Sequence, residues 1–256
     1  NVTNGIAHRR WLCYSNPGLT ALLDETIGTQ YRKQPETLKK FEAFKDDKSV
    51  LSRLEQIKKE NKISFANHIF EKTGEKILLG IESNLRGECG SIDVEEKDYP
   101  QLDLILAGVH RFIFYKSLGD FVHLLCGNVF RSALKSPPSK RLVDYNTRCY
   151  VNAVKNNPID VLTHVGYLCY CDPVEIAKVC ADYGTYIEIN TKKTHLTDEQ
   201  WLKVIETGVK FVVDSDAHSV DRIGDNKLFL ETAKRVDFPL DRIMNIDGRT
   251  PELRFR

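Results

Sequence analysis

The sequence lacks both a long apolar run and an excess of charge of one sign. No stretch approaches the roughly 20 consecutive apolar residues that cross a bilayer, and 37 basic residues are balanced by 36 acidic ones. A nearly neutral chain has no global field with which to hold a polyanion. We therefore expect no membrane partner and no nucleic-acid partner, and any anionic substrate must be held by a local site.

The sequence also lacks an even, closely spaced set of cysteines. Its seven cysteines are scattered between Cys13 and Cys180, whereas secreted disulfide frameworks are usually even in number and belong to small domains. Cys169 and Cys171 form a C-x-C pair, which is too short a motif to indicate a metal or redox site by itself. A reducing compartment, the cytoplasm, is the expected location.

From about residue 75 onward, short apolar runs alternate with amphipathic helical segments, which is the pattern of repeated strand–helix units. Asp172 and Pro173 are typical of a helix start and Gly184 of a helix end. A second helix is indicated between Thr197 and Gly208. The apolar runs are residues 77–81, 102–109, 160–163, 185–189, 209–213 and, more weakly, 242–246.

Crossovers of this length join parallel strands, which wind into either a doubly wound sheet or a barrel. No Gly-rich dinucleotide loop and no Walker loop follows any of these runs, so the barrel is favoured. Residues 1–75 read as helices rich in Lys and Glu, without a linker that would mark a separate domain. We expect a single domain over residues 1–256, with residues 1–75 as a helical addition and residues 76–256 as the strand–helix units.

Side chains able to bind metals follow the predicted strands. In a barrel, the loops after the strands converge on one face, so these side chains are expected to meet. Imidazole combined with carboxylate suits Zn, Mn or Fe. One such residue after a strand is more often a structural group, but a set at successive strand ends favours a metal site. The set comprises Glu82, His110, His164, Asn190, Asp216 and His218.

Five segments then resemble, in the same order, motifs of the PHP (polymerase and histidinol phosphatase) family. The segment Gly80-Ile81-Glu82-Ser83-Asn84 is similar to its G-[IV]-E-A-N motif, and Thr163-His164-Val165-Gly166 to its T/S-H-P-G strand end. Residues 102–110, 186–190 and 213–219 match its other motifs. Val165, where the family usually has proline, affects the shape of the loop more than ligation.

The resemblance implies a distorted (βα)7 TIM-like barrel that binds up to three divalent transition metal ions. It implies a histidinol-phosphatase-like enzyme that hydrolyses a small phosphate monoester. His164, Asp216 and His218 are the expected catalytic residues. Arg222 and Asn190 are expected to bind the substrate, because phosphate requires a nearby cation and a polar group at the strand ends. The implied metal ligands are Glu82, His110, His164, Asp216 and His218.

The sequence departs from the family pattern at its beginning. Members open with an H-x-H strand and then a D-H strand, and neither precedes Glu82; the nearest candidates are His8 and His68. Because the first residue is Asn1 and not methionine, we expect these two strands to lie upstream. Two alternatives stay open: a PHP-like barrel that has lost ligand strands and serves as a structural or interaction subunit for an unknown partner, and a metal-dependent amidohydrolase, whose motif order fits Glu82 poorly.

Overall fold

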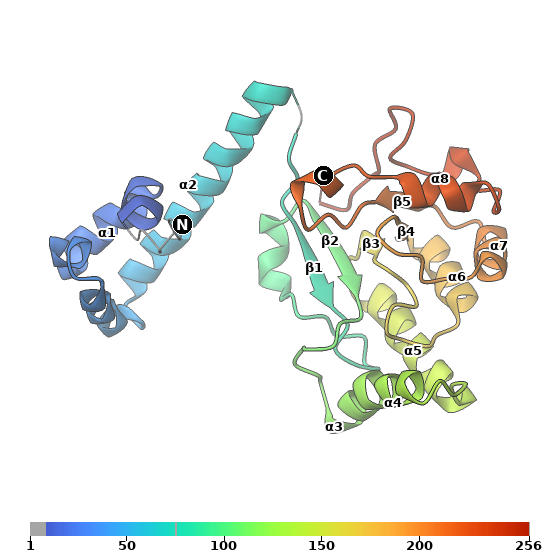
Figure 1. The fold of residues 1–256 in the computed structure, drawn as a ribbon. Helices are drawn as coiled ribbons and strands as arrows, with labels where there is room; N and C mark the ends of the chain where they lie inside the picture. Colours follow the sequence, from blue (N-terminus) through green and yellow to red (C-terminus); the bar gives the residue numbers. More distant parts are fainter. Residues whose placement is uncertain (1–8, 75, 256) are drawn as a thin grey trace, which may run out of the picture. The chain divides into compact units, whose positions relative to one another are not determined.

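The structure is a computed structural model that describes residues 9–74 and 76–255. The chain divides into two compact units, Asn1–Ile77 and Leu78–Arg256 (Figure 1). This boundary lies close to residue 75, where the sequence pattern changes; the single domain of residues 1–256 stays a prediction. Within the described ranges, no helix is both long and apolar enough to cross a membrane.

The first unit is helical and consists of η1 (Arg9–Tyr14), α1 (Pro17–Ile27), η2 (Thr29–Arg32), η3 (Pro35–Phe44) and α2 (Lys48–Thr73). The side chain of Asp47 caps the start of α2 by accepting two backbone N–H groups, and Gly74 ends the helix in the left-handed region at φ 74°. This helix runs without a break from Lys48 to Thr73, because no glycine or proline interrupts the chain there.

The second unit is built on one parallel sheet whose strand order follows the chain: β1 (Gly80–Asn84), β2 (Leu104–Gly108), β3 (Val161–Leu162), β4 (Tyr186–Asn190) and β5 (Phe211–Asp214). Each of the first five predicted runs contains or overlaps one of these strands, which confirms the α/β class. The first strand begins at Gly80, opposite Leu104, so residues 77–79 precede the paired region. Because the strands are parallel, their C-terminal ends lie along one edge.

Helices connect the strands and cover the sheet: η4 (Glu96–Gln101), α3 (Leu118–Asp120), η5 (Phe121–Gly127), α4 (Asn128–Ala133), α5 (Lys140–Asn156), α6 (Pro173–Tyr183), α7 (Asp198–Glu206), η6 (Val220–Arg222), α8 (Lys227–Ala233) and η7 (Leu240–Arg242). The caps predicted for α6 are confirmed: Asp172 accepts two N–H groups and Gly184 is left-handed. The capping box of Thr197 and Gln200 begins α7. Along the sheet, α5 packs on α6 and α6 on α7 (Figure 1).

The sixth strand, expected at residues 242–246, is wrong as a strand. Only an isolated parallel bridge joins Ile243 to Phe211. Next to it, the side-chain amide of Asn245 accepts the N–H of Val213 at 2.8 Å and donates to its carbonyl at 2.7 Å. A side chain thus supplies the pair of hydrogen bonds that a neighbouring strand would give β5, which explains why the backbone here forms no ladder.

Asp160 links the sheet to the C-terminal segment. Its carboxylate accepts the N–H of Ile105 in β2 and the N–H of Arg254, both at 2.8 Å. The guanidinium of Arg254 donates to the carbonyls of Ile159 and Tyr183. Asp160 is 1% exposed, and burial raises its pKa. These bonds lie at the edge of the sheet opposite the strand ends, where they hold β2, β3 and the C-terminal segment together.

Candidate metal centre

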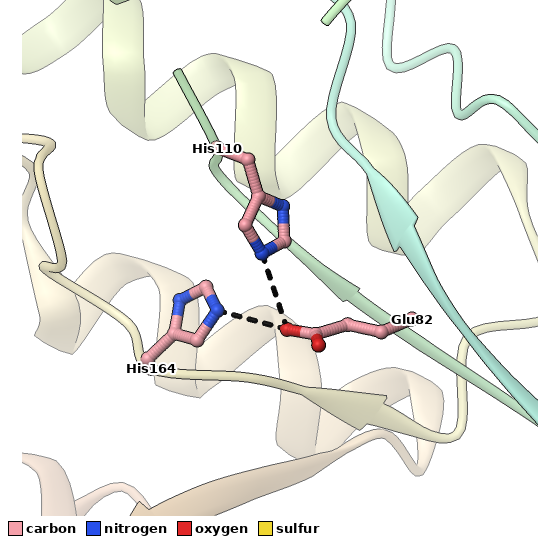
Figure 2. Close-up of side chains that lie close together, drawn as sticks. All are labelled: Glu82, His110 and His164. Carbon is pink, nitrogen blue, oxygen red and sulfur yellow. Dashed lines mark hydrogen bonds and ion pairs between the residues drawn. The ribbon is translucent and has the colours of Figure 1, made fainter. Parts of the chain in front are cut away.

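Three side chains from successive strand ends converge on one point (Figure 2). Glu82 lies within β1, and His110 and His164 follow β2 and β3 by two residues. The Oε1 atom of Glu82 is 2.9 Å from Nε2 of His164 and 3.3 Å from Nε2 of His110. One ligand atom from each residue lies within 4.8 Å of the other two. The structure thus brings together three of the five predicted ligands.

These three donors suit a transition metal ion. Ligand atoms at about 2.0–2.1 Å from a tetrahedral zinc ion lie roughly 3.3 Å from one another, which is close to the separations of Glu82 from the two histidines. Among the described residues, Nδ1 of His110 and Nδ1 of His164 are buried and have no hydrogen-bond partner. In both imidazoles Nε2 faces the Glu82 carboxylate, so this nitrogen is the one that could bind an ion there.

The backbone at the end of β2 makes room for this arrangement. A Cβ atom on Gly108 would lie 2.5 Å from Cε1 of His164 and 2.4 Å from Oγ1 of Thr163. His164 itself has a φ of 33°, an uncommon value for a residue other than glycine and one that concentrates at functional sites. Thr163 Oγ1 donates to Glu82 Oε1 at 3.1 Å. The absence of a side chain at Gly108 and the unusual backbone of His164 thus let its imidazole lie against Glu82. Thr163 adds a second donor to the same carboxylate oxygen.

The two glutamates of the centre, Glu82 and Glu188, have pKa values shifted in opposite directions. Hydrogen bonds from His110 and His164 hold the pKa of Glu82 far below its usual range. Glu188, in the middle of β4, is 4% exposed, and burial raises its pKa to about 8. Its carboxyl group accepts the backbone N–H of His164. Glu188 was not predicted as a site residue. The signal that could have indicated it is an acidic residue within a largely apolar strand, Tyr186–Asn190.

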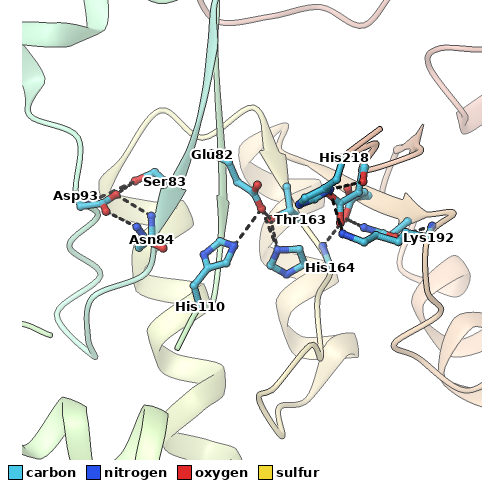
Figure 3. Close-up of polar contacts among 12 residues, drawn as sticks. Glu82, Ser83, Asn84, Asp93, His110, Thr163, His164, Lys192 and His218 are labelled. Atoms are coloured by element: carbon cyan, nitrogen blue, oxygen red, sulfur yellow. Dashed lines mark hydrogen bonds and ion pairs between the residues drawn. The ribbon is translucent and has the colours of Figure 1, made fainter. Parts of the chain in front are cut away.

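His218, one of the two remaining predicted ligands, lies beside Lys192 (Figure 3). Both side chains contact Asp216, the other predicted ligand. Nζ of Lys192 lies 3.0 Å from Oδ2 of Asp216 and 3.1 Å from Nδ1 of His218. Asp216 has a φ of 43°, so a second residue after a strand occupies the left-handed region. In this structure a lysine ammonium is the cation between the two side chains. The contact of Lys192 with Asp216 and His218 was not predicted from the sequence.

A pocket of about 380 Å³ joins the two groups: its wall includes the three converging residues, Asp216 and His218. Asn190 also lines this pocket, and its side-chain oxygen accepts the N–H groups of Lys192 and Lys193. The wall further contains Tyr167 and His195, which the sequence did not indicate. Burial lowers the pKa of His195 to about 4, with a further contribution from His164.

Arg222 and the two upstream histidines are placed differently. Arg222 lies in η6 and forms an ion pair with Asp225 at 2.7 Å. The described residues that line the pocket of the metal centre do not include Arg222. His68 lies in α2 of the first unit, and His8 falls outside the described residues. The substrate-binding role of Arg222 stays a prediction.

The loop after β1 is fastened by a carboxylate (Figure 3). Oδ1 of Asp93 accepts the hydroxyl of Ser83 and the N–H of Asn84, both at 2.7 Å. Ser83 is fully buried, so these bonds fix the strand immediately after Glu82.

Comparison with known proteins finds relatives named probable phosphatase. The chain is 29% identical over 181 residues to such a protein of Shewanella sp. strain ANA-3, covering 67% of this chain and 62% of that protein. It is 31% identical over 187 residues to one of Tolumonas auensis, covering 69% of this chain and 65% of the relative. A protein of Thermoanaerobacter sp. strain X514 matches at 29% identity, with 68% and 65% covered. The chain thus spans less than two thirds of each of these relatives.

A family model described as carbohydrate phosphorylase matches residues 1–81. This match corresponds closely to the first unit, Asn1–Ile77, and ends one residue before Glu82. An alignment of more than 180 residues with the probable phosphatases cannot fit within that unit and must extend over much of the second. Every residue of the candidate metal centre lies outside the phosphorylase match.

Proposed function

We propose that the second unit is a metal-dependent hydrolase of phosphate monoesters, of the PHP histidinol-phosphatase-like kind. The observation that carries the proposal is the convergence of Glu82, His110 and His164 at three successive strand ends. The names of the relatives support a phosphatase. Zn, Mn or Fe would be held by these three residues, with Asp216 and His218 available for further ions, up to three in all.

A divalent ion in such a site acts as a Lewis acid toward a phosphoryl oxygen and makes water acidic enough to react near neutral pH. The chain itself supplies the groups that hold the substrate. Lys192 and Lys193 line the pocket, and their ammonium groups can pair with the phosphate dianion. Asn190 holds the backbone at both lysines, because its side-chain oxygen accepts their backbone N–H groups.

His195 and Glu188 have different roles in this proposal. His195 is neutral at physiological pH, since burial lowers its pKa to about 4, so it offers a nitrogen donor or acceptor without adding charge. Glu188 lies behind His164 and holds the backbone of that residue through its N–H. In the overall reaction, water replaces the alcohol on phosphorus, and the leaving oxygen takes a proton to give a free alcohol and inorganic phosphate.

The proposal extends to the architecture and the location. The strictly sequential parallel order β1-β2-β3-β4-β5 supports a TIM-like barrel more than a doubly wound sheet, because the latter reverses its strand order at a switch point. Right-handed crossovers in such a series place the helices on one side of the sheet. The free state of the cysteines supports the cytoplasm as the location.

Metal analysis of the purified full chain, together with hydrolysis of p-nitrophenyl phosphate in Mn or Zn, tests the function. We expect bound transition metal and metal-dependent release of phosphate. His164→Ala and Asp216→Ala should each lower kcat/KM by at least about 100-fold, the usual effect of losing a ligand or its support. Asp237→Ala, an exposed surface change in the same unit, is the matched control. Histidinol phosphate belongs in the same assay.

Each competing function predicts a different result. A scaffold without catalytic activity would release no phosphate even when loaded with metal, and an amidohydrolase would cleave amide substrates in preference to phosphate esters. Protein that neither retains metal through native purification nor binds it on addition would contradict the proposed function.

A further inference from the structure

A second cavity lies against the candidate metal centre. Its volume is about 300 Å³, and four residues of its wall also line the pocket of the metal centre: His110, Tyr167, Lys193 and His195. The ring of Tyr167 lies 5.1 Å from that of His164 and 4.9 Å from that of His195. A molecule with one end at Glu82 can therefore extend past this aromatic pair into the second cavity.

The wall of the second cavity combines an apolar floor with positive charge. Leu124, Leu125 and Val129 come from η5 and α4, and Leu168 comes from the loop after β3. Arg111 and Lys193 also line it, whereas none of its described lining residues is an aspartate or glutamate. An apolar body is favoured by such a wall, and a cationic end is disfavoured because nothing in the wall neutralises it.

We propose that this cavity receives the alcohol part of the phosphate ester, and that the alcohol is a compact apolar group, a single ring in size, whose free end carries an anionic substituent. The inference rests on the proposed phosphatase function and names its substrate class. The volume is at the lower end of the roughly 300–1,000 Å³ of ligand pockets, which favours one ring over a nucleoside or a long chain. Arg111, which lines this cavity and not the pocket of the metal centre, is the cation that selects the anionic end.

Three esters with alkyl leaving groups test the substrate class on the full chain: 4-carboxybenzyl phosphate, 4-(aminomethyl)benzyl phosphate and methyl phosphate. The first two differ only in the sign of the distant charge, and methyl phosphate has nothing to fill the cavity. We expect the carboxybenzyl ester to exceed the aminomethyl ester in kcat/KM by about fivefold and methyl phosphate by at least about tenfold.

A matched pair of variants isolates the cavity. Ser132→Glu places a carboxylate in the wall, whereas Ala133→Glu makes the same charge change at the next position of α4; both residues are exposed, and Ala133 is not among the lining residues. Ser132→Glu should lower the preference for the carboxybenzyl ester at least about fivefold. In Ala133→Glu the preference should stay within about twofold of the unchanged protein. Far-UV circular dichroism checks that both variants fold.

A binding measurement without metal provides a second readout. Titration of the full chain with the free alcohol 4-(hydroxymethyl)benzoate, followed by ligand-observed NMR, should show saturable binding that Ser132→Glu weakens and Ala133→Glu does not. Hydrolysis of all three esters with no preference among them, or with a preference that Ser132→Glu leaves unchanged, would overturn this inference and leave the phosphatase proposal intact. Absence of hydrolysis with every ester and every metal would overturn both.

Discussion

Replacing Asp160 with alanine tests how the sheet of the second unit is held together. The Asp160 carboxylate accepts two backbone N–H groups, one from Ile105 in β2 and one from Arg254 near the end of the chain. Alanine offers neither bond. Asp160→Asn keeps one side-chain oxygen, which can still accept the N–H of Ile105. An NH2 group replaces the second oxygen and cannot accept the N–H of Arg254, so this variant loses one bond instead of two.

The expected loss of stability follows from the burial of the two donors. Ile105 is completely buried, so its N–H cannot reach water and its isolation costs about 1–3 kcal/mol. Arg254 is largely exposed, so water can replace part of the second bond, and its loss adds about 0.5–1.5 kcal/mol. We therefore expect Asp160→Ala to lower the free energy of unfolding by about 2–4 kcal/mol, and Asp160→Asn by about 1 kcal/mol.

The assay must report on the second unit alone, and the sequence permits this. The chain has two tryptophans, and Trp201 is 5% exposed in the second unit. In a Trp11→Phe background, urea denaturation followed by the fluorescence of Trp201 gives the unfolding of that unit. Asp237→Ala serves as control and should change stability by no more than about 0.5 kcal/mol. An Asp160→Ala protein as stable as the control would show that these two bonds do not hold the sheet.

Three further predictions concern the centre and the thiols. Zn or Mn at 100 times its dissociation constant should raise the melting temperature of the second unit by roughly 5–11 °C, since such binding adds about 2.7 kcal/mol; Glu82→Gln should abolish the rise, and a full shift in that variant would exclude Glu82 as a ligand. Gly108→Ala should weaken metal binding at least about tenfold, because the added methyl group displaces His164. The circular dichroism spectrum should stay unchanged. An unaltered affinity in calorimetric titration would contradict the steric argument. At pH 8 a disulfide reagent should label the exposed Cys89 and Cys126 rapidly. The three buried thiols should react only after unfolding, because burial raises their pKa. Equal labelling rates for exposed and buried cysteines, measured by mass spectrometry, would disprove this prediction.

The strands and their order were accessible from the sequence because each rests on a local signal. Apolar runs bounded by helix caps located β3, β4 and β5, and the caps at Asp172 and Thr197 fall where predicted. The expected meeting of Glu82, His110 and His164 followed from one topological rule, that the ends of parallel strands share an edge. Position along a strand was sufficient for these residues because each lies within or directly after its own strand.

The contacts that were not predicted from the sequence depend on the tertiary structure, which no local pattern encodes. Lys192 follows β4 and looks like an ordinary loop lysine, yet its ammonium lies between Asp216 and His218. The failed sixth strand has the same origin, since a side chain, Asn245, takes the hydrogen bonds of Val213. Secondary-structure propensity describes only the local preference of the backbone. The position of the Lys192 ammonium group and the loss of the sixth strand both depend on a partner more than 20 residues away in the sequence.

Lys192 also connects the geometry of the centre to its chemistry. An ammonium and a divalent ion cannot both occupy the space between Asp216 and His218, because like charges within a few ångströms repel strongly. If these residues bind an ion, Lys192 must swing away. Because Lys192 lines the pocket, the phosphate of the proposed substrate is the anion that it would then meet. Metal binding at Asp216 would in this way release the cation that holds the substrate. Lys192→Met should therefore tighten metal binding at that position while raising KM for phosphate esters several-fold, and a variant that weakens both would show that the lysine supports the metal site instead of competing with it.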